Sequence, residues 1–522
     1  MINNILFACI LLFPLKLALI RRYLLGSFGR RLRHPPSIRS LPVVGHALSL
    51  PPGLDHINFL DMGKKLGSDI IHLNIMGQSI VVLNSAQAAS DLLDKRSAIY
   101  SDRVNAPMVN DRALLDWSDF GGMLPYNDAW RRQRRRMTNW LNPRSVIQFN
   151  GLQQDEARLL LGRLLHLSGT PGLFEKVKHQ FSFTTGSTML RLIYGYRPKE
   201  DQDSIYVNAL QASINLFQST MISNFLVNAF PILARVPDWV PGTGWKRTAR
   251  KWREQKNEAV NAPYEWTKQQ IAKGNFEHSI LSSLLQEDES SSELSIADQE
   301  KELKQLCYTL FVGGTDTLAT AFLSFVAAMV TNPETQKKAQ NEIDSVIGYA
   351  TRLPTLADSS QLPYIRQLTL EVMRWLPTAP TGGPPHACSQ DDIYRGYNIQ
   401  NGTMVMGNVW AMSRDEVLYK DPERFDPERF ADPDVVPPPG FGWGRRKCPG
   451  THFAEASLFL VISSMLTTFA LCCKVDKNGK EITPRIEGDY NQLALTIKPF
   501  EFEIRPRSEE HRQLILDNIP KD

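Results

Sequence analysis

Cysteine is scarce in this chain, and its scarcity narrows the possible classes of protein. The 522 residues include six cysteines, too few for the disulfide framework of a small secreted domain. No two of them stand at the C-x-x-C spacing of a structural zinc site. A reducing compartment is therefore expected, and each cysteine has to be judged by its own neighbours: Cys9, Cys307, Cys388, Cys448, Cys472 and Cys473.

Acidic residues are absent from the first 54 positions, where seven lysines and arginines precede Asp55. The whole chain has a net charge of +4, so subtracting these seven charges leaves −3 for the rest. A slightly acidic body argues against a nucleic-acid-binding protein, whose positive charge lines the folded surface. Glycine and proline, with 32 and 33 residues, are near their average frequency, which excludes collagen-like and largely disordered chains.

The N-terminus contains the first long apolar run. Residues 5–20 are apolar except for Lys16, and a helix counted from Ile2 is about 28 Å long, close to a bilayer core of about 30 Å. Arginines follow at once, so the positive-inside rule places the body in the cytosol. The alternatives are a buried core helix and a cleaved signal peptide, which needs a basic segment before the run and small residues after it. We expect a single-pass transmembrane signal-anchor over residues 1–22 and a basic, proline-rich connector over 23–50.

The remaining chain has no internal repeat and no long linker, which predicts one domain over residues 51–510 and a tail over 511–522. Apolar residues recur at three-to-four spacing and predict helices, one of which Pro263 should kink or split. The fold class expected is mainly α with a small β-sheet region (α+β). The clearest predicted helices are 156–166, 248–273, 298–330, 334–347 and 362–375, and the predicted strands are 70–75, 79–84, 396–399, 403–406 and 494–504.

The most specific segment is FGWGRRKCPG, residues 441–450, which fits the pattern F-x-x-G-x-R-x-C-x-G. A chance match in a chain of this length has a probability on the order of 10⁻⁴ at average residue frequencies. The pattern is similar to the haem-binding loop of a known enzyme family, and this resemblance implies that Cys448 is a thiolate that binds haem iron. A thiolate donates strongly to the metal, and glycines let backbone N–H groups approach its sulfur. The apolar run 453–462 predicts a helix that begins just after Cys448 and directs its positive end at the thiolate.

This segment resembles the haem-ligand loop of the cytochrome P450 family, and the resemblance extends over about residues 35–505. It implies the family's fold, Cys448 as the iron ligand, haem b as cofactor and O2 as co-substrate. Electrons would come from NADPH through a reductase, with cytochrome b5 as a further partner. The protein would lie in the endoplasmic reticulum membrane with its catalytic domain in the cytosol. The alternative for Cys448 is a buried structural cysteine in a glycine-rich turn.

Two glycines interrupt the longest predicted helix in the segment GGTDT, residues 313–317, at a cost of about 1 kcal/mol each relative to alanine. Close helix packing is one explanation. The resemblance implies another, an opening over the haem in which the Thr317 hydroxyl donates to the Gly313 carbonyl. Asp316 and Thr317 would then relay protons as general acids. The family usually has a second Thr or Ser at Leu318, and we interpret this departure as a packing difference.

The segment WRRQRRR, residues 130–136, contains five arginines, and a solvated charged face is the usual explanation of such a run. In the family, the spacing W-x-x-x-R donates to a haem propionate, which implies Trp130 and Arg134 here. The other arginines would face an acidic reductase. The resemblance adds further cofactor-binding residues: Arg446, His386, Arg103 and Phe441.

Glu371 and Arg374 share one face of a predicted helix at i, i+3. The spacing alone says little, because Glu509 and Arg512 have it too. The resemblance implies a structural Glu–Arg–Arg network that adds Arg429.

The resemblance also implies that four segments line the distal pocket, together with a tip near Gln492–Leu493. They have almost no charge after Asp119, which argues for an apolar, medium-sized substrate. The apolar segment 217–242 is also a candidate to rest on the membrane. The four segments are 106–123, 210–230, 310–315 and 379–384.

The function expected is that of a haem-thiolate monooxygenase that inserts one atom of O2 into an apolar small molecule. The segments YSDR, LPYNDAWRRQRR and CPGTHFAE together resemble fungal microsomal enzymes of secondary metabolism, so terpenoid or polyketide tailoring is the leading hypothesis. One alternative is a haem-thiolate isomerase or dehydratase that needs no reductase, which an intact Asp316–Thr317 pair disfavours. The other is a haem-binding carrier without turnover.

Overall fold

The computed structural model describes residues 33–42, 44–221, 224–287, 294–476, 478–489 and 494–520. The predicted membrane anchor, the first part of the connector and the tip at Gln492–Leu493 lie outside these ranges. The described body is mainly helical with small sheets, which confirms the predicted fold class.

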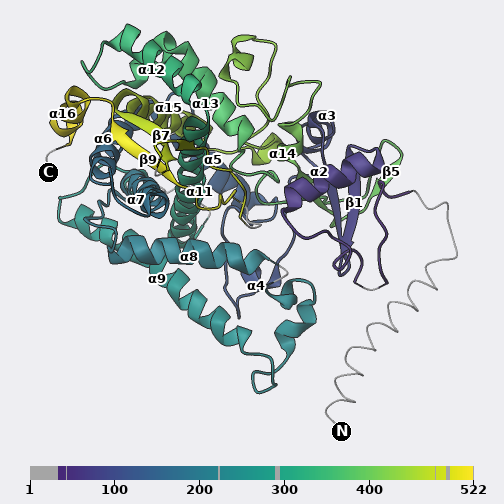
Figure 1. The fold of residues 1–522 in the computed structure, drawn as a ribbon. Coiled ribbons are helices and arrows are strands. Elements are labelled where there is room, and N and C mark those ends of the chain that lie inside the picture. The colour runs from purple at the N-terminus through teal and green to yellow at the C-terminus, as the bar shows by residue number, and fades with distance from the viewer. Residues whose placement is uncertain are drawn as a thin grey trace, which may run out of the picture.

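Helix α11 (Ile296–Thr331) runs through the middle of the helical region (Figure 1). It begins where the Ser295 side chain accepts from the Asp298 N–H, and it ends at Asn332, before Pro333. It packs against α7 (Leu173–Tyr194) and α15 (Thr451–Thr468), and its buried residues belong to the main hydrophobic core. Among the described helices it is the one long and apolar enough to cross a bilayer, and 72% of its most apolar window is buried in the protein.

The remaining helices surround this core, and most predicted helices agree with them to within a few residues. Helices α8 and α9 lie together along one side of the molecule, and α12 and α13 lie on another (Figure 1). Their bounds are α2 Asp55–Leu66, α3 Ala86–Ala89, α4 Pro107–Asn110, α5 Asp128–Leu141, α6 Asn150–Leu165, α8 Ser204–Thr220, α9 Trp245–Ala272, α10 Ile280–Leu284, α12 Pro333–Ile347, α13 Pro363–Trp375, α14 Val409–Met412 and α16 Glu509–Asn518.

The strands form small sheets at the edges of the helical body. One sheet has the order β1-β2-β6-β3, in which β2 pairs with β6 in parallel, with Ile80 opposite Met404, and the other neighbours are antiparallel. A second sheet has the order β8-β7-β9, and β4 pairs with β5. The bounds are β1 Ile70–Ile75, β2 Gln78–Leu83, β3 His386–Ala387, β4 Asp392–Tyr394, β5 Tyr397–Ile399, β6 Met404–Gly407, β7 Phe469–Val475, β8 Glu481–Ile482 and β9 Phe502–Pro506.

Two expectations about secondary structure are wrong in part. Helix α9 continues through Pro263, which is buried inside it, instead of splitting there. The strand predicted over 494–504 is confirmed only at its end, as β9. The residues before β9 form other hydrogen bonds. For example, the Leu495 N–H donates to the Thr378 carbonyl at 2.8 Å.

The predicted C-terminal tail, residues 511–522, contains most of a helix, α16. Helix α16 packs against α6 and β9, with His511 and Ile515 buried. The Glu509–Arg512 ion pair lies on its exposed side.

Candidate active site

The loop that carries Cys448 is held in a sharp turn directly before α15. The Cys448 N–H donates to the carbonyl of Phe441 at 2.8 Å, and α15 begins at Thr451, which confirms the helix predicted after the cysteine. Gly444 has a φ of +52°, and a Cβ there would lie 2.2 Å from the carbonyl oxygen of Leu93. Glycine is therefore required at this position both by the backbone conformation and by the close approach of Leu93.

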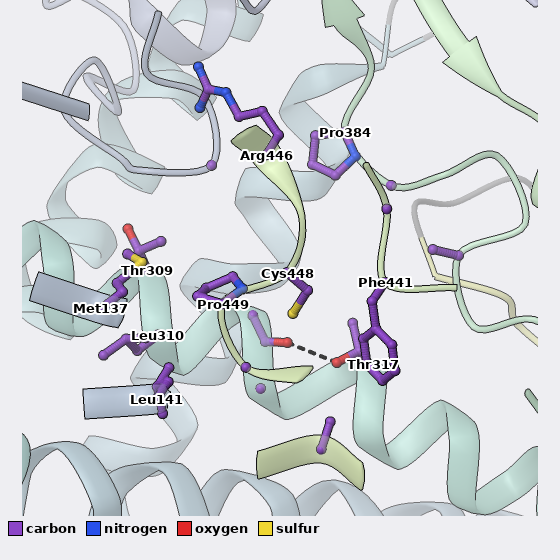
Figure 2. Close-up of a pocket in the computed structure, with 18 of the residues that line it drawn as sticks. Met137, Leu141, Thr309, Leu310, Thr317, Pro384, Phe441, Arg446, Cys448 and Pro449 are labelled. Atoms are coloured by element: carbon purple, nitrogen blue, oxygen red, sulfur yellow. Dashed lines mark hydrogen bonds between the residues drawn. The ribbon is translucent and has the colours of Figure 1, made fainter. Parts of the chain in front are cut away.

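The Cys448 side chain opens onto a cavity of about 360 Å³ (Figure 2). Burial raises the pKa of its thiol, while the N–H of Gly450 and the charges of Arg134 and Lys447 act in the opposite direction. A metal ion at the sulfur would bind the thiolate form outright. Eight of the predicted site residues line this cavity: Arg103, Trp130, Arg134, Thr317, His386, Phe441, Arg446 and Cys448.

Trp130 and Arg134 line the cavity from one face of α5 and fit a carboxylate-bearing cofactor. Neither the indole N–H of Trp130 nor the guanidinium of Arg134 has a hydrogen-bond or ion-pair partner within the described ranges. Burial lowers the pKa of Arg134, and Cys448 opposes this shift. A planar guanidinium beside an indole N–H is a donor set that suits a carboxylate.

Two more arginines and a histidine line the same cavity, and their own hydrogen bonds hold them in place. Arg103 Nη1 donates to the carbonyls of Pro384 and Pro385, each at 2.8 Å, and His386 Nδ1 lies 2.7 Å from the Tyr100 carbonyl. Arg446 donates to Ser101 and Leu124 and stacks on Trp130 with its guanidinium carbon 4.4 Å from the ring centroid.

The two arginines are electrostatically costly without an anion, and the histidine is neutral without one. Burial lowers the pKa of Arg103 to about 10, that of Arg446 to about 8 and that of His386 to about 3. Asp102 offsets the shifts of the two arginines only in part. No carboxylate is among the residues found to line this cavity. The donor set therefore fits a cofactor that carries carboxylates and binds a thiolate, as haem does.

The two glycines of α11 have different reasons to be there. A Cβ on Gly313 would meet nothing within 4 Å, since this residue faces the cavity, whereas a Cβ on Gly314 would lie 2.4 Å from Met189 Sδ of α7. Close helix packing is confirmed for Gly314, and the open space at Gly313 is compatible with the opening that the resemblance implies. Thr317 Oγ1 donates to the Gly313 carbonyl at 2.8 Å, as predicted (Figure 2).

Asp316 does not line the cavity with its neighbour Thr317. Burial raises the pKa of its carboxyl to about 6. Its charge contributes to the raised pKa values of Tyr206 on α8 and Tyr308 on α11. The carboxyl therefore lies on the side of α11 that is packed by α8, while the Thr317 hydroxyl faces the cavity.

The predicted Glu–Arg–Arg network is present. Arg374 Nε donates to Glu371 Oε2 at 2.7 Å and Arg429 Nε donates to the same oxygen at 3.1 Å, with Glu371 and Arg374 fully buried. The Asp426 N–H adds a bond of 2.7 Å to Glu371 Oε1. The network thus fastens α13 to the irregular segment 413–429 that precedes the cysteine loop.

The arginines of residues 130–136 have two kinds of surroundings, which the sequence did not indicate. Arg132 Nε lies 3.1 Å from the buried Glu302 of α11 and Arg136 lies 3.9 Å from it, so these two do not form part of a free docking face. Arg131 remains exposed and stacks on Tyr126, as does Arg445 from the cysteine loop.

The predicted substrate-facing segments are partly wrong. Leu310, Ala379 and Gly121 confirm three of the four segments, but no described residue of 210–230 lines this cavity. Met189 and Leu192 of α7 line it instead, because α7 packs on α11 beside the cavity, whereas α8 contacts α11 at Tyr308.

Sequence reasoning also missed Gln133, Met137 and Leu141, which line the cavity along α5 with Trp130 and Arg134. The signal was available, since these positions follow the i, i+3, i+4, i+7 spacing of one helix face.

Comparison with known proteins agrees with this geometry. The family model "Cytochrome P450" matches residues 35–504. The chain is 36% identical to cytochrome P450 monooxygenase 98 of Postia placenta, over 93% of both chains. It is 35% identical to cytochrome P450 monooxygenase claR of Ampulloclitocybe clavipes, over 96% of this chain and 91% of that protein. It is also 36% identical to cytochrome P450 monooxygenase ple1 of Rhodocybe pseudopiperita, over 94% and 93%.

Proposed function

Since the chain belongs to the cytochrome P450 family, and is thereby an oxidoreductase that incorporates oxygen, we propose that it hydroxylates or similarly oxidises an apolar fungal natural product. The observation that carries this proposal is the Cys448 side chain opening onto a mostly apolar cavity. The family uses haem, O2 and electrons from a reductase. Haem with a thiolate ligand supplies an electron-rich iron that favours O–O cleavage.

Different residues of this chain bind different parts of that cofactor, which we take to be haem b. Cys448 supplies the iron ligand, and Trp130 and Arg134 donate to a propionate. Arg103 and Arg446 add positive charge around the propionates from positions that backbone carbonyls hold, and a propionate beside His386 would favour its protonated, donating form. Phe441 closes the wall beside the sulfur.

We assign the delivery of protons to Thr317 and Asp316. The Thr317 hydroxyl faces the cavity and keeps its position through the bond to Gly313. Asp316, with a pKa raised to about 6, can hold or release a proton near neutral pH from the side of α11 next to the cavity face. In this assignment Thr317 acts in the cavity and Asp316 resupplies it.

The substrate class follows from the cavity wall. Met137, Leu141, Leu192 and Leu310 make it mostly apolar, which fits a medium-sized terpenoid or polyketide better than a charged metabolite. The relatives named above are fungal monooxygenases, which supports a role in secondary-metabolite tailoring.

The proposed location is the endoplasmic reticulum membrane, through residues 1–22, with the catalytic domain in the cytosol. Exposed apolar side chains in the described part of segment 217–242 are suited to rest on the same membrane: Leu226, Phe230, Ile232 and Trp239. The electron donor is an NADPH-dependent reductase, with cytochrome b5 as a second donor.

The decisive experiment is the spectrum of the reduced protein with carbon monoxide. We expect the red-shifted Soret band that a thiolate ligand produces. The variant Cys448→Ser should lack this band, whether or not it still binds haem. The unshifted band of a histidine-ligated haem in an intact preparation would exclude Cys448 as the ligand. Turnover that requires the reductase would separate a monooxygenase from an isomerase or dehydratase, and any turnover would exclude a carrier.

A further inference from the structure

His386 is the uncharged member of the group that the proposed function places around the haem propionates. It lies on β3, it is 5% exposed, and it lines the cavity together with Arg103 and Arg446. Strand β3 pairs with β6 on one side, and on the other side the Ala387 N–H donates to the Asp102 carbonyl at 2.8 Å. The backbone that carries the ring is therefore fixed before a ligand enters the cavity.

One ring nitrogen of His386 is already hydrogen-bonded. Nδ1 lies 2.7 Å from the Tyr100 carbonyl oxygen, and since a carbonyl can only accept, Nδ1 must carry a proton. Tyr100 is itself held in place, because its hydroxyl donates to Asp392 at 2.8 Å. In the neutral imidazole the second nitrogen, Nε2, then has a lone pair and no proton. Nε2 has no partner among the described residues and keeps accessible surface at the cavity wall, so the neutral ring offers a ligand an acceptor only.

The charges around the ring keep it neutral while no anion is bound. Burial first, and then the charges of Arg103 and Arg446, lower the pKa of His386 to about 3. The bond to Tyr100 acts in the opposite direction. The loop that pairs with β3 also carries Asp102, whose carboxylate accepts the N–H of Arg103 at 2.9 Å, but no carboxylate of the described ranges lines the cavity. The positive charge beside the ring is therefore only partly balanced by the protein.

A carboxylate cannot bond to this neutral ring unless one more proton is added. The carboxylate and the Nε2 lone pair are both acceptors, and the Tyr100 carbonyl prevents the ring from moving its proton from Nδ1 to Nε2. A bound carboxylate also offsets the charges of Arg103 and Arg446 and favours the imidazolium form by direct contact. The missing proton has to come from the solvent.

Resting on the haem site of the proposed function, we propose that haem binding is coupled to the uptake of one proton by Nε2 of His386, which then donates to a haem propionate. One N–H bond forms at the ring, the proton comes from water or buffer, and no electron is transferred. The contribution of His386 to haem affinity therefore weakens as pH rises. Cys448 has the opposite effect, because its thiol loses a proton when it binds iron.

The first test measures the protonation of the ring directly in full-length protein labelled with ¹⁵N-histidine. The haem-loaded protein is reduced and treated with carbon monoxide, and only preparations that show the thiolate Soret band are used. An imidazolium has two similar ¹⁵N shifts, whereas a neutral ring has two very different ones, because one nitrogen keeps a lone pair. At about pH 7 we expect an imidazolium signal that is lost in His386→Gln. The control His72→Gln, which changes a half-buried histidine on β1 outside the cavity wall, should keep it.

The wild type provides a comparison that needs no variant. The imidazolium signal should be absent from the full-length apoprotein at the same pH and appear when haem is added. A neutral pair of shifts for His386 in the loaded protein, or an imidazolium signal already present without haem, overturns the proposal. Either result leaves the proposed function standing, because the thiolate Soret band is verified in the same sample.

The second test measures the effect of the proton on affinity. The wild type and His386→Gln each compete for haem with apomyoglobin at about pH 6 and about pH 7, below the pKa of about 8 of Arg446. Cys448 releases the same proton in both proteins, so its effect cancels in the ratio of the two dissociation constants. The ratio of the variant to the wild type should fall about tenfold over this pH unit, the change that one bound proton produces. The ratio for His72→Gln should stay constant, and a constant ratio for His386→Gln would contradict the coupling.

Discussion

Thr317 and Asp316 are neighbours in α11 but have different surroundings, because adjacent residues of a helix point about 100° apart. The hydroxyl faces the cavity and the carboxyl faces the packing between α11 and α8. The motif GGTDT therefore contains two functions that are adjacent in sequence and separate in space.

We expect Thr317→Ala to uncouple electron consumption from product formation. The variant loses the hydroxyl that faces the cavity, and general acids of this kind contribute about 10²-fold or more. Product formed per electron donor consumed should fall at least about tenfold, while the Soret band with carbon monoxide is retained. Thr317→Ser keeps the hydroxyl and should restore coupling; unchanged coupling in the alanine variant would refute the relay.

Asp316 should make stability depend on pH. Its folded pKa of about 6 lies above the ordinary value of 3.8, so the folded protein holds the proton more tightly than the unfolded chain. The stability of the wild type therefore falls as pH rises from about 4 to about 6 and stays lowered above that range. Asp316→Asn removes this cost, and its gain in unfolding free energy should be roughly 1 kcal/mol larger at about pH 8 than at about pH 5. Thermal denaturation at the two pH values measures it, and an equal gain at both would contradict the assignment.

At the scale of elements, the join between α13 and the segment 413–429 depends on a single carboxylate. Glu371 accepts bonds from Arg374, Arg429 and the Asp426 N–H, all at buried or nearly buried positions. Because a buried ion pair that loses one partner leaves uncompensated charge, this carboxylate is critical for the position of the segment before the cysteine loop.

We expect Glu371→Gln to destabilise the fold by roughly 3–5 kcal/mol, because two buried guanidinium groups lose their anion. The chain contains its own control. Glu509 and Arg512 have the same i, i+3 spacing on the exposed side of α16, and Glu509→Gln should change stability by less than about 0.5 kcal/mol. Urea denaturation followed by circular dichroism and by haem retention compares the two. If the two variants had equal urea midpoints, the i, i+3 spacing and not the burial of the pair would determine the loss of stability.

At the scale of the whole molecule, distant parts of the chain meet beside the cysteine loop. Tyr126 lies between Arg131 of α5 and Arg445 of the loop, with the Arg445 guanidinium donating to its hydroxyl. Arg131, Arg445 and Lys447 are exposed beside the cysteine loop. Asp128 pairs with Arg131 at 2.6 Å, so this surface keeps a net positive charge. Such a surface suits an acidic electron donor.

We expect the double variant Arg131→Glu with Arg445→Glu to raise the KM for the reductase at least about fivefold at low salt, with the difference shrinking as ionic strength rises. The Soret band with carbon monoxide should be unchanged. Lys337→Glu, on the exposed side of α12, provides a control of charge alone and should leave the KM near the wild-type value. If the KM of the double variant rose by the same factor at every salt concentration, the cause would be local structural damage and not weaker docking.

Local chemistry is what the sequence determined by itself. The cysteine loop, the start of α15 and the Thr317–Gly313 bond depend on residues within a few positions of one another, so a motif carries them. Helix periodicity likewise predicted α6, α9, α11, α12 and α13, because an apolar stripe at helical spacing has to be buried.

The tertiary structure alone decided which side chains share the cavity. Arg132 and Arg136 turn to Glu302, Met189 takes the place expected of residues 210–230, and Gln133 enters the wall although it lies within an arginine run. Each outcome depends on which faces of α5, α7 and α11 pack together. That choice is made by side-chain volume across helices distant in sequence, such as the missing Cβ of Gly314 against Met189, and no local pattern records it.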